Sequence, residues 1–321
     1  MKPSFHTRLL NSPFDDPCLY VRLLRESRAL LFDTGFTVNL APRDILKISD
    51  IFVSHTHVDH FIGFDNILRV SLKKEIPLRL YGPEGFINKV EGKLKGYSWN
   101  LIGEYPLIIE VSEITENTIK KTVFKSENSF NRKDLDTTPF EGIILKDSFF
   151  RVSAAVLDHQ IPCLAFSLEE DYHINIDKVK LKQLNLPVGP WLSKLKKAIR
   201  EHALNDTITI GDRKFTFAEL KDIANITKGQ KLSYVADILG SEENIRKVVE
   251  MVKGSDILFI EAYFLDRDKD RAKERYHLTA KQAGRIAREG CIERLVVFHF
   301  SPKYMDIPQE VVKEAEEEFR V

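Results

Sequence analysis

Short runs of apolar residues, rich in β-branched and aromatic side chains, recur along the chain, and most of them end on a charged or imidazole side chain. Runs of this length and composition predict strands that are half or fully buried. We expect strands at CLYVRLL from Cys18, ALLFD ending at Asp33, DIFVSH ending at His55, RVSAAVLDH ending at His159, CLAFSL from Cys163, KLSYVAD ending at Asp237, DILFIE ending at Glu261 and RLVVFH ending at His299.

Helical periodicity lies between and after these runs, most clearly over residues 241–253 and 279–289. The second stretch carries its own end signals, because Thr279 and Gln282 have the spacing of a capping box and Gly290 suits a helix stop. Strands mixed with helices predict a layered α/β domain whose sheets are covered by helices.

The segment from 171 to 229 breaks this rhythm. It is charged, contains Pro187, Gly189 and Pro190, and separates two predicted strands. An excursion of this length from a compact domain is more often functional than passive. We therefore expect a single domain over residues 1–321, with an arm inserted at 171–229.

Composition narrows the class of protein. The 321 residues are 43% hydrophobic and 30% charged, as in soluble globular proteins, and 15 Gly with 13 Pro exclude a collagen-like or generally disordered chain. The three cysteines form no CxxC pair, which argues against a disulfide framework or a cysteine zinc site and favours the cytoplasm. We expect no export signal and no membrane span, since no apolar run approaches the ~20 residues that a span needs.

Charge is balanced at 48 basic against 48 acidic side chains, so the chain as a whole offers no bulk attraction for nucleic acid. Any polyanion must therefore be held locally. Residues 178–200 suit that role because they carry no acidic side chain and the following basic ones: Lys178, Lys180, Lys182, Lys194, Lys196, Lys197 and Arg200. A solvated helix face would explain the same run equally well.

The strongest chemical signal is SHTHVDHFIG, an HxHxDH motif at the end of a predicted strand. His55 and His57, two residues apart, point the same way, while Asp59 and His60 fall in the following turn and can face a second ion. The motif therefore predicts two metal ions that share one loop. Imidazole and carboxylate ligands without thiolate favour zinc, although manganese or iron accepts the same donors.

Four donors from one loop cannot complete two coordination shells, so other strand ends must supply further ligands. His159, Asp237 and His299 stand at such ends. Each of them alone is more often a hydrogen-bonded structural residue than a ligand. As a set that follows HxHxDH, they become ligand candidates.

At this point the chain resembles a known family. HxHxDH followed by VLDHQIPCLAF, SYVAD, FIEAYF, YHLTAKQA and VVFHFSPKY, together with PVGPWLSKLK in the arm, is similar to ribonuclease Z, the tRNA 3′ endonuclease family of the metallo-β-lactamase-fold hydrolases. The resemblance covers about residues 33–304. It implies an αββα sandwich of two mixed sheets flanked by helices.

The resemblance also implies roles for individual residues. His55, His57 and His159 would hold one ion, Asp59, His60 and His299 the other, and Asp237 would bridge them. Asp59, His277 and Glu261 would be catalytic, with His277 and Glu261 forming a charge-relay pair, and Asp33 would support the metal loop. The residues expected to bind substrate are Gly189, Pro190, Lys194, Lys196, Lys197, Ser301, Lys303 and Tyr304; packing would explain the last three equally well.

The function implied is an endoribonuclease that trims tRNA precursors and leaves a 3′-hydroxyl, with two divalent ions that we expect to be zinc. The arm would grip RNA, in relatives often from the partner subunit, so a cytoplasmic homodimer is implied. The sequence departs from the family at its N-terminal loop, at Ile238, at Ile260 and at Tyr263. A small-molecule hydrolase of the same fold, such as a cyclic nucleotide phosphodiesterase or a thioester hydrolase, is therefore the alternative, and a binding module without activity is a third.

Overall fold

The structure is a computed structural model that describes residues 4–24 and 26–321. These residues divide into two compact units. The first unit contains the chain up to Ile144, together with Val152–Leu168 and Lys231–Val321, and the second contains Leu145–Arg151 and Glu169–Gln230. The second unit thus coincides closely with the predicted arm and adds the short stretch around Phe149 to it.

The larger sheet of the first unit begins with antiparallel strands and continues with parallel ones. Pairing is parallel from β3 to β6 and antiparallel on either side, which makes the sheet mixed. Its strands, in spatial order, are β1 (Phe5–Leu9), β2 (Leu19–Leu23), β3 (Arg28–Phe32), β4 (Ile48–Phe52), β5 (Leu78–Pro83), β6 (Ile108–Ile114), β7 (Thr118–Lys125) and β8 (Lys133–Asp134), with β9 (Thr138–Pro139) also paired to β7.

The second large sheet contains most of the strands that end on candidate ligands. Its spatial order is β10 (Ile143–Lys146), β11 (Phe150–Asp158), β12 (Pro162–Glu170), β17 (Lys231–Val235), β18 (Ile257–Glu261) and β19 (Leu295–Phe298). β17, β18 and β19 are parallel. Their carboxyl ends therefore lie at one edge of the sheet, so that residues following them meet there.

Aromatic side chains fill the space between the two sheets. Phe32 of β3 lies 5.8 Å from Phe166 of β12 and 5.7 Å from Tyr234 of β17, measured between ring centroids. Phe52 of β4 also contacts Phe166, at 5.6 Å. Large rings of this kind bury much apolar surface and give the inner layer its fixed geometry.

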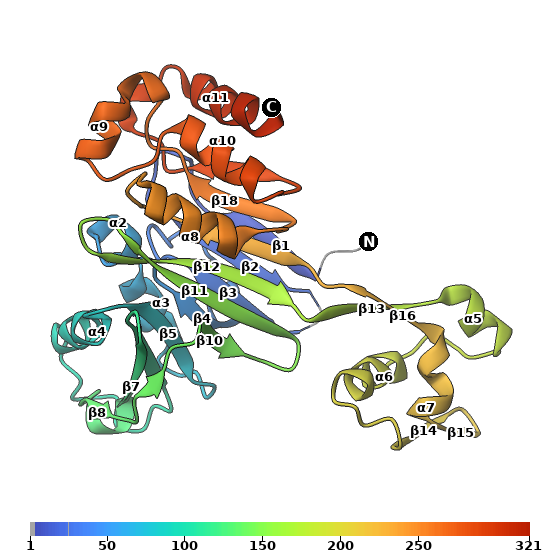
Figure 1. Cartoon of the computed structure of the whole chain (residues 1–321). Coiled ribbons are helices and arrows are strands. Elements are labelled where there is room, and N and C mark those ends of the chain that lie inside the picture. The colour runs from blue at the N-terminus through green and yellow to red at the C-terminus, as the bar shows by residue number, and fades with distance from the viewer. Residues whose placement is uncertain (1–3, 25) are drawn as a thin grey trace. The chain divides into compact units, whose positions relative to one another are not determined.

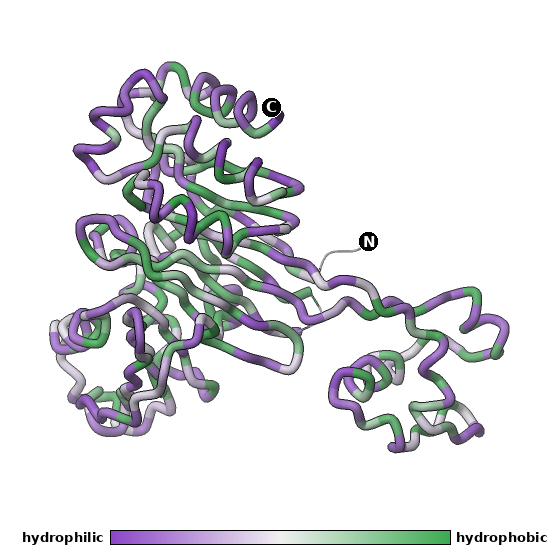
Figure 2. Tube along the Cα trace, viewed as in Figure 1, coloured by the Kyte–Doolittle hydropathy of each residue, from purple (hydrophilic) through white to green (hydrophobic). Residues whose placement is uncertain are grey.

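Helices cover the outer faces of both sheets, with polar residues outward and apolar residues inward (Figures 1 and 2). On the larger sheet lie α1 (Pro42–Ile45), α3 (Phe64–Ser71) and α4 (Phe86–Lys95), and on the other α8 (Glu242–Val252), α10 (Ala280–Glu289) and α11 (Pro308–Arg320). The shorter elements are α2 (Val58–Phe61), α9 (Lys269–Glu274) and the 3₁₀ turns η1 (Ser126–Asn128), η3 (Asp266–Asp268) and η4 (Pro302–Tyr304). The predicted αββα sandwich is confirmed.

The predicted strands and both predicted helices are present. Ser241 caps α8, and Thr279 and Gln282 form the capping box of α10. Gly290 ends α10, but in an ordinary helical conformation, and the left-handed residue is Cys291, with φ of 52°. Gly290 is also tightly packed, because a Cβ there would lie 3.0 Å from Cγ2 of Val252. No helix in the described residues is long and apolar enough to cross a membrane.

The second unit has an apolar cluster of its own. A two-stranded ribbon, β13 (Tyr172–Ile176) with β16 (Ala224–Lys228), leads into it. Beyond the ribbon lie α5 (Lys178–Gln183), α6 (Trp191–Arg200), the hairpin β14 (Thr207–Ile210) and β15 (Arg213–Thr216), α7 (Phe217–Leu220) and η2 (Lys221–Ile223). Leu195, Leu220 and Ile223 are among its buried residues. This segment therefore folds around a core and is more than an extended loop.

Two helical glycines allow a matched test of packing. A Cβ at Gly284 of α10 would lie 2.3 Å from the carbonyl oxygen of Ala315 in α11, whereas a Cβ at Gly92 of α4 would meet nothing within 4 Å. Gly284→Ala should destabilise the protein by about 1–3 kcal/mol through overpacking. Gly92→Ala should stabilise it by roughly 0.5–1 kcal/mol through helix propensity. Denaturant unfolding of both variants measures this, and a neutral Gly284→Ala would contradict the described contact between α10 and α11.

Candidate metal centre

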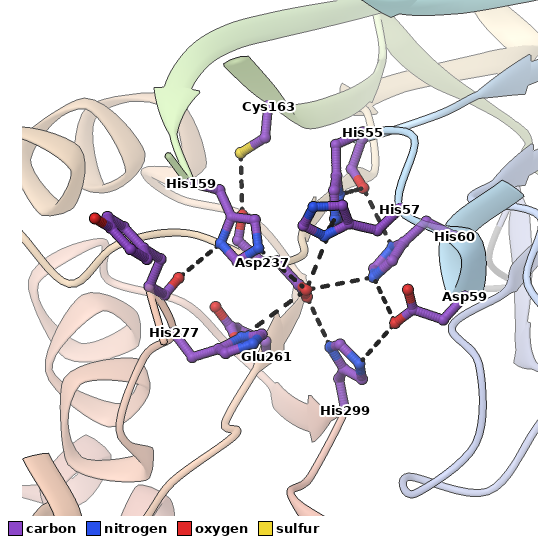
Figure 3. Close-up of polar contacts among 12 residues, drawn as sticks. His55, His57, Asp59, His60, His159, Cys163, Asp237, Glu261, His277 and His299 are labelled. Carbon is purple, nitrogen blue, oxygen red and sulfur yellow. Dashed lines mark hydrogen bonds and ion pairs between the residues drawn. The ribbon is translucent and has the colours of Figure 1, made fainter. Parts of the chain in front are cut away.

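The candidate ligands are held at the ends of strands from both sheets (Figure 3). His55 follows β4, His57 is the N-cap residue of α2, and Asp59 and His60 lie within α2. From the other sheet, His159 directly follows β11 and His299 directly follows β19. Asp237 lies just after β17, at the edge where the parallel strands end. The fold thus brings residues separated by more than two hundred positions into one cluster.

One cluster contains His55, His57, His159 and Asp237, whose ligand atoms lie within 4.8 Å of one another. Nε2 of His55 is 2.9 Å from Nδ1 of His57. Nε2 of His55 and Nε2 of His159 each lie 3.8 Å from Oδ2 of Asp237. Nδ1 of His159 donates to the carbonyl oxygen of Tyr276 at 2.7 Å, which fixes the tautomer and leaves Nε2 facing the cluster.

A second cluster contains Asp59, His60, Asp237 and His299, again within 4.8 Å. Nε2 of His60 lies 3.4 Å from Oδ2 of Asp59 and 3.4 Å from Oδ2 of Asp237. Nε2 of His299 lies 3.4 Å from Oδ2 of Asp59, and its Nδ1 donates to Oδ1 of Asp237 at 2.7 Å. Asp237 belongs to both clusters, which is the position that a bridging carboxylate requires.

Asp33 lies beside these candidate ligands and forms hydrogen bonds that hold them in place. Its buried carboxylate accepts hydrogen bonds from the backbone N–H and hydroxyl of Ser54, from Nδ1 of His60 and from the hydroxyl of Tyr234. The bond from His60 points the other ring nitrogen toward the cluster. Asp33 has φ of 54°, and Tyr276 and His299 have φ of 60° and 57°. Left-handed backbone at residues other than glycine is strained, and here it falls on three residues that orient the site.

Two of the imidazoles are suited to donate a lone pair. Burial, opposed by the charge of Asp237, lowers the pKa of His159 to about 4. Burial and the neighbouring His60 charge hold the pKa of His55 well below its usual value. Both rings are therefore neutral at pH 7, which is the form that binds a metal ion.

Two other imidazoles are charged in the protein without metal. Burial favours the neutral form of His299, but the carboxylates of Asp237 and Asp59 outweigh it and raise its pKa to about 9. For His60, burial is likewise outweighed by Asp237 and Asp33, and its pKa lies well above the usual value. In the protein without metal, the protons on Nε2 of His60 and of His299 thus supply the positive charge that metal ions would supply.

The donor set fits divalent metal ions. Nε2 of His60 is buried and makes no hydrogen bond among the described residues; the carboxylates of Asp59 and Asp237 lie 3.4 Å away, so a metal ion at this position would meet one imidazole nitrogen and two carboxylates. Imidazole nitrogens and carboxylate oxygens without a thiolate are a common ligand set for zinc and related ions. The clusters therefore suit divalent metal binding.

The pair predicted for proton transfer lies beside the clusters. Nδ1 of His277 donates to Oε2 of Glu261 at 2.8 Å, and Oε1 of Glu261 accepts from the backbone N–H groups of Ile238 and Leu278. Burial lowers the pKa of His277, but the charges of Glu261 and Asp237 outweigh it, so the pKa is raised. The ring of Tyr263 stacks on His277 at 4.0 Å with an interplanar angle of 11°. Tyr263 is one of the positions at which the sequence departs from the family.

A cavity of about 500 Å³ opens over the clusters. Its walls include His57, Asp59, His277 and His299. Two cationic residues that the sequence analysis did not select also line it. Arg271 and Arg275 are these residues. Their spacing of four positions on a short helix before His277 was the available signal, because such residues share a helix face.

The predicted substrate residues fall into three groups. Ser301 and Lys303 line the cavity, and Lys303 pairs with Asp268 at 2.6 Å. Tyr304 is not brought to the cavity: it is fully buried and its hydroxyl donates to Asp268. The remaining residues lie in the second unit: Gly189, Pro190, Lys194, Lys196 and Lys197. Of the lysines there, Lys194 and Lys197 are exposed, whereas Lys196 donates to the carbonyl oxygen of Ile174.

Comparison with known proteins now assigns the class and then the family. A model of the metallo-beta-lactamase superfamily matches residues 13–125, and the short form of human tRNase Z superposes with a TM-score of 0.54 at 20% identity, over 94% of this chain and 93% of that chain. The protein therefore has the metallo-β-lactamase fold.

Ribonuclease Z of Deinococcus radiodurans is 28% identical over 304 residues, covering 93% of this chain and 90% of the relative. Ribonuclease Z of Nanoarchaeum equitans is 32% identical over 287 residues, covering 86% and 76%. The chain belongs to the ribonuclease Z family, and the resemblance seen in the sequence is confirmed.

Metal loading should release protons at pH 7. His299 and His60 have raised pKa values and hold protons that must leave before Nε2 of each ring can bind a metal ion, so about two protons should leave. Metal affinity should rise with pH as these protons are lost, and the contribution of His299 should fade above its pKa of about 9. Titration calorimetry in buffers of different ionisation enthalpy measures the release. No proton release at pH 7 would contradict the assignment of these two rings as ligands.

Proposed function

We propose that the protein is a metal-dependent phosphodiester hydrolase that cuts tRNA precursors at their 3′ ends and leaves a 3′-hydroxyl. Two observations together support this proposal. Relatives named ribonuclease Z match most of the chain, and two clusters of possible metal ligands share the carboxylate of Asp237. Two ions held at neighbouring clusters would activate the attacking water and offset the charge of the phosphate at one point.

We assign His55, His57 and His159 to one ion and Asp59, His60 and His299 to the other, with Asp237 shared. When bound, a pair of divalent ions supplies an activated water and positive charge beside the phosphate. Zinc is the ion that this ligand set favours. Asp59 takes the proton of the attacking water in this proposal, since its side chain is 35% exposed and lies at the cavity, within reach of solvent.

The leaving oxygen needs a proton, and His277 is placed to deliver it. Its Nδ1 is held by Glu261, so Nε2 is the nitrogen left for the substrate. The carboxylate that orients the ring also favours the charged, proton-donating form. Stacking on Tyr263 restricts the plane of the ring. Water is the nucleophile, so the product ends are a 3′-hydroxyl and a 5′-phosphate.

The second unit serves, in this proposal, as the RNA-binding arm, with Gly189, Pro190, Lys194 and Lys197 contacting tRNA away from the cut. Exposed lysines bind phosphates through counterion release, which makes such binding dependent on salt. We further propose a cytoplasmic homodimer, because the family resemblance implies that one subunit's arm serves the other's site.

Removing the arm distinguishes a tRNA-cutting enzyme from a hydrolase of small molecules. The ribbon pairs Ile176 with Ala224, so residues 178–222 can be replaced by an Asn-Gly turn that keeps the ribbon. Wild-type protein should cut a tRNA precursor to a 3′-hydroxyl and a 5′-phosphate, and the shortened protein should show a KM for the precursor raised tenfold or more, through loss of phosphate contacts.

Hydrolysis of bis-p-nitrophenyl phosphate by both proteins reports on the centre itself. If the wild type hydrolyses only the small ester, the protein is a hydrolase of small molecules and the ribonuclease proposal is wrong. If the shortened protein loses both activities together, the second unit is structural and does not act as an arm.

His277→Ala should leave the metal content near normal and slow precursor cleavage by roughly 100-fold or more, as loss of a general acid does. The slowing should shrink for bis-p-nitrophenyl phosphate, whose leaving group needs no proton. Elemental analysis and the two rates measure this. Since Asp237, Glu261, His277 and His299 also form a cluster of possible ligands, loss of metal in the variant would show that His277 is a ligand instead.

A further inference from the structure

A second cavity adjoins the candidate metal centre and shares His277 with it. It measures about 390 Å³, and its walls come from α9, from Gln282 and from the segment 239–241. None of the candidate metal ligands lines this second cavity, whereas several line the first. His277 therefore stands at the boundary between the place where a phosphate would react and a separate space behind it.

The short helix α9, together with its C-cap residue Arg275, presents cations to both cavities. Arg271 and Arg275 line the first cavity, and Lys269 and Lys273 line the second. Residues four apart share a helix face, whereas residues two apart point to nearly opposite faces. The sequence KDRAKER thus places one pair of positive charges on each side of the helix, while Ala272 packs into the core.

These four cations are available to a ligand. All four are exposed, and within the described part of the chain none of them has a hydrogen-bond or ion-pair partner for its charged group. Most other cations near the site are engaged, as Lys303 is by Asp268 and Arg267 by Glu310. Asp270 also lines the second cavity and reduces its positive charge without pairing with either lysine.

The position of His277 indicates on which side of the cleaved bond the RNA strand would enter the second cavity. In the proposed reaction His277 protonates the leaving 3′ oxygen, so the nucleotide that carries this oxygen must lie against His277. The scissile phosphate occupies the side of the metal ligands. The space left for the departing nucleotide is the second cavity, on the other side of the ring.

We propose that the second cavity is the binding site for the nucleotide that keeps the released 3′-hydroxyl, and that Lys269 and Lys273 bind the phosphate on its 5′ side. This inference rests on the proposed function and extends it to the direction in which the RNA lies. The trailer, which leaves with the 5′-phosphate, extends away from Lys269 and Lys273.

A double-variant cycle between protein and RNA tests the contact. The protein variant is Lys269→Gln with Lys273→Gln, and the RNA variant is a tRNA precursor with an uncharged methylphosphonate at the phosphate 5′ of the last mature nucleotide. Each change alone should raise KM about tenfold, and both together should raise it little further, because each removes the same contact. The slope of log KM against log salt should fall by about 1 in the protein variant, because one phosphate contact is lost.

Two matched controls isolate the effect. Lys281→Gln with Lys313→Gln removes the same charge from exposed positions that line neither cavity, and should leave KM unchanged. A methylphosphonate in the trailer should combine additively with the changes at Lys269 and Lys273.

The outcomes are distinguishable. If the wild type does not cut the precursor, the proposed function itself fails. If it does cut and the upstream methylphosphonate is additive with the lysine changes, the lysines do not bind that phosphate and the inference is wrong. If only the trailer methylphosphonate is non-additive, the strand lies in the opposite direction and the inference is also wrong.

Discussion

The arrangement of the site depends on one buried carboxylate. Oδ2 of Asp237 lies within 3.9 Å of ring nitrogens from four histidines, His55, His60, His159 and His277. Burying a negative charge is unfavourable unless positive charge and hydrogen bonds compensate it. In the protein without metal, the raised pKa values of His60 and His299 provide that charge as protons. The same electrostatic demand is what would make the centre select cations, since two divalent ions compensate the carboxylates better than two protons do.

The fold positions this carboxylate by joining two sheets that each carry half of the centre. One half follows β4 and is held from beneath by Asp33, whose carboxylate also accepts from Tyr234 of the other sheet. The other half follows β11 and the parallel strands β17, β18 and β19, and Glu261 and the carbonyl oxygen of Tyr276 hold its members in place. Left-handed backbone occurs at Asp33, Tyr276 and His299, which contact or belong to the candidate ligand clusters, and strain of this kind is often found at functional sites.

Much of this was predictable from the sequence, and the reasons for the exceptions are physical. The strand ends that carry His159, Asp237 and His299 could be predicted because hydrophobic periodicity and composition indicate strands. The HxHxDH motif is typical of a metal-binding loop. Gly290 was predicted as a helix stop and does end α10, but the left-handed residue is the next one, Cys291, which residue type alone did not indicate. Tyr304 was selected by its distance along the chain from His299, which carries no information on the direction of a side chain. The role of Arg271 and Arg275 depends on which face of α9 lines the cavity, and only tertiary packing decides that.

The central claim is that two metal ions share Asp237. Crystals of protein purified without chelator, measured at the zinc absorption edge, test it most directly. The account predicts two anomalous peaks per chain on either side of the Asp237 carboxylate, one among His55, His57 and His159 and the other among Asp59, His60 and His299. A single peak, or a peak between Glu261 and His277, would contradict it.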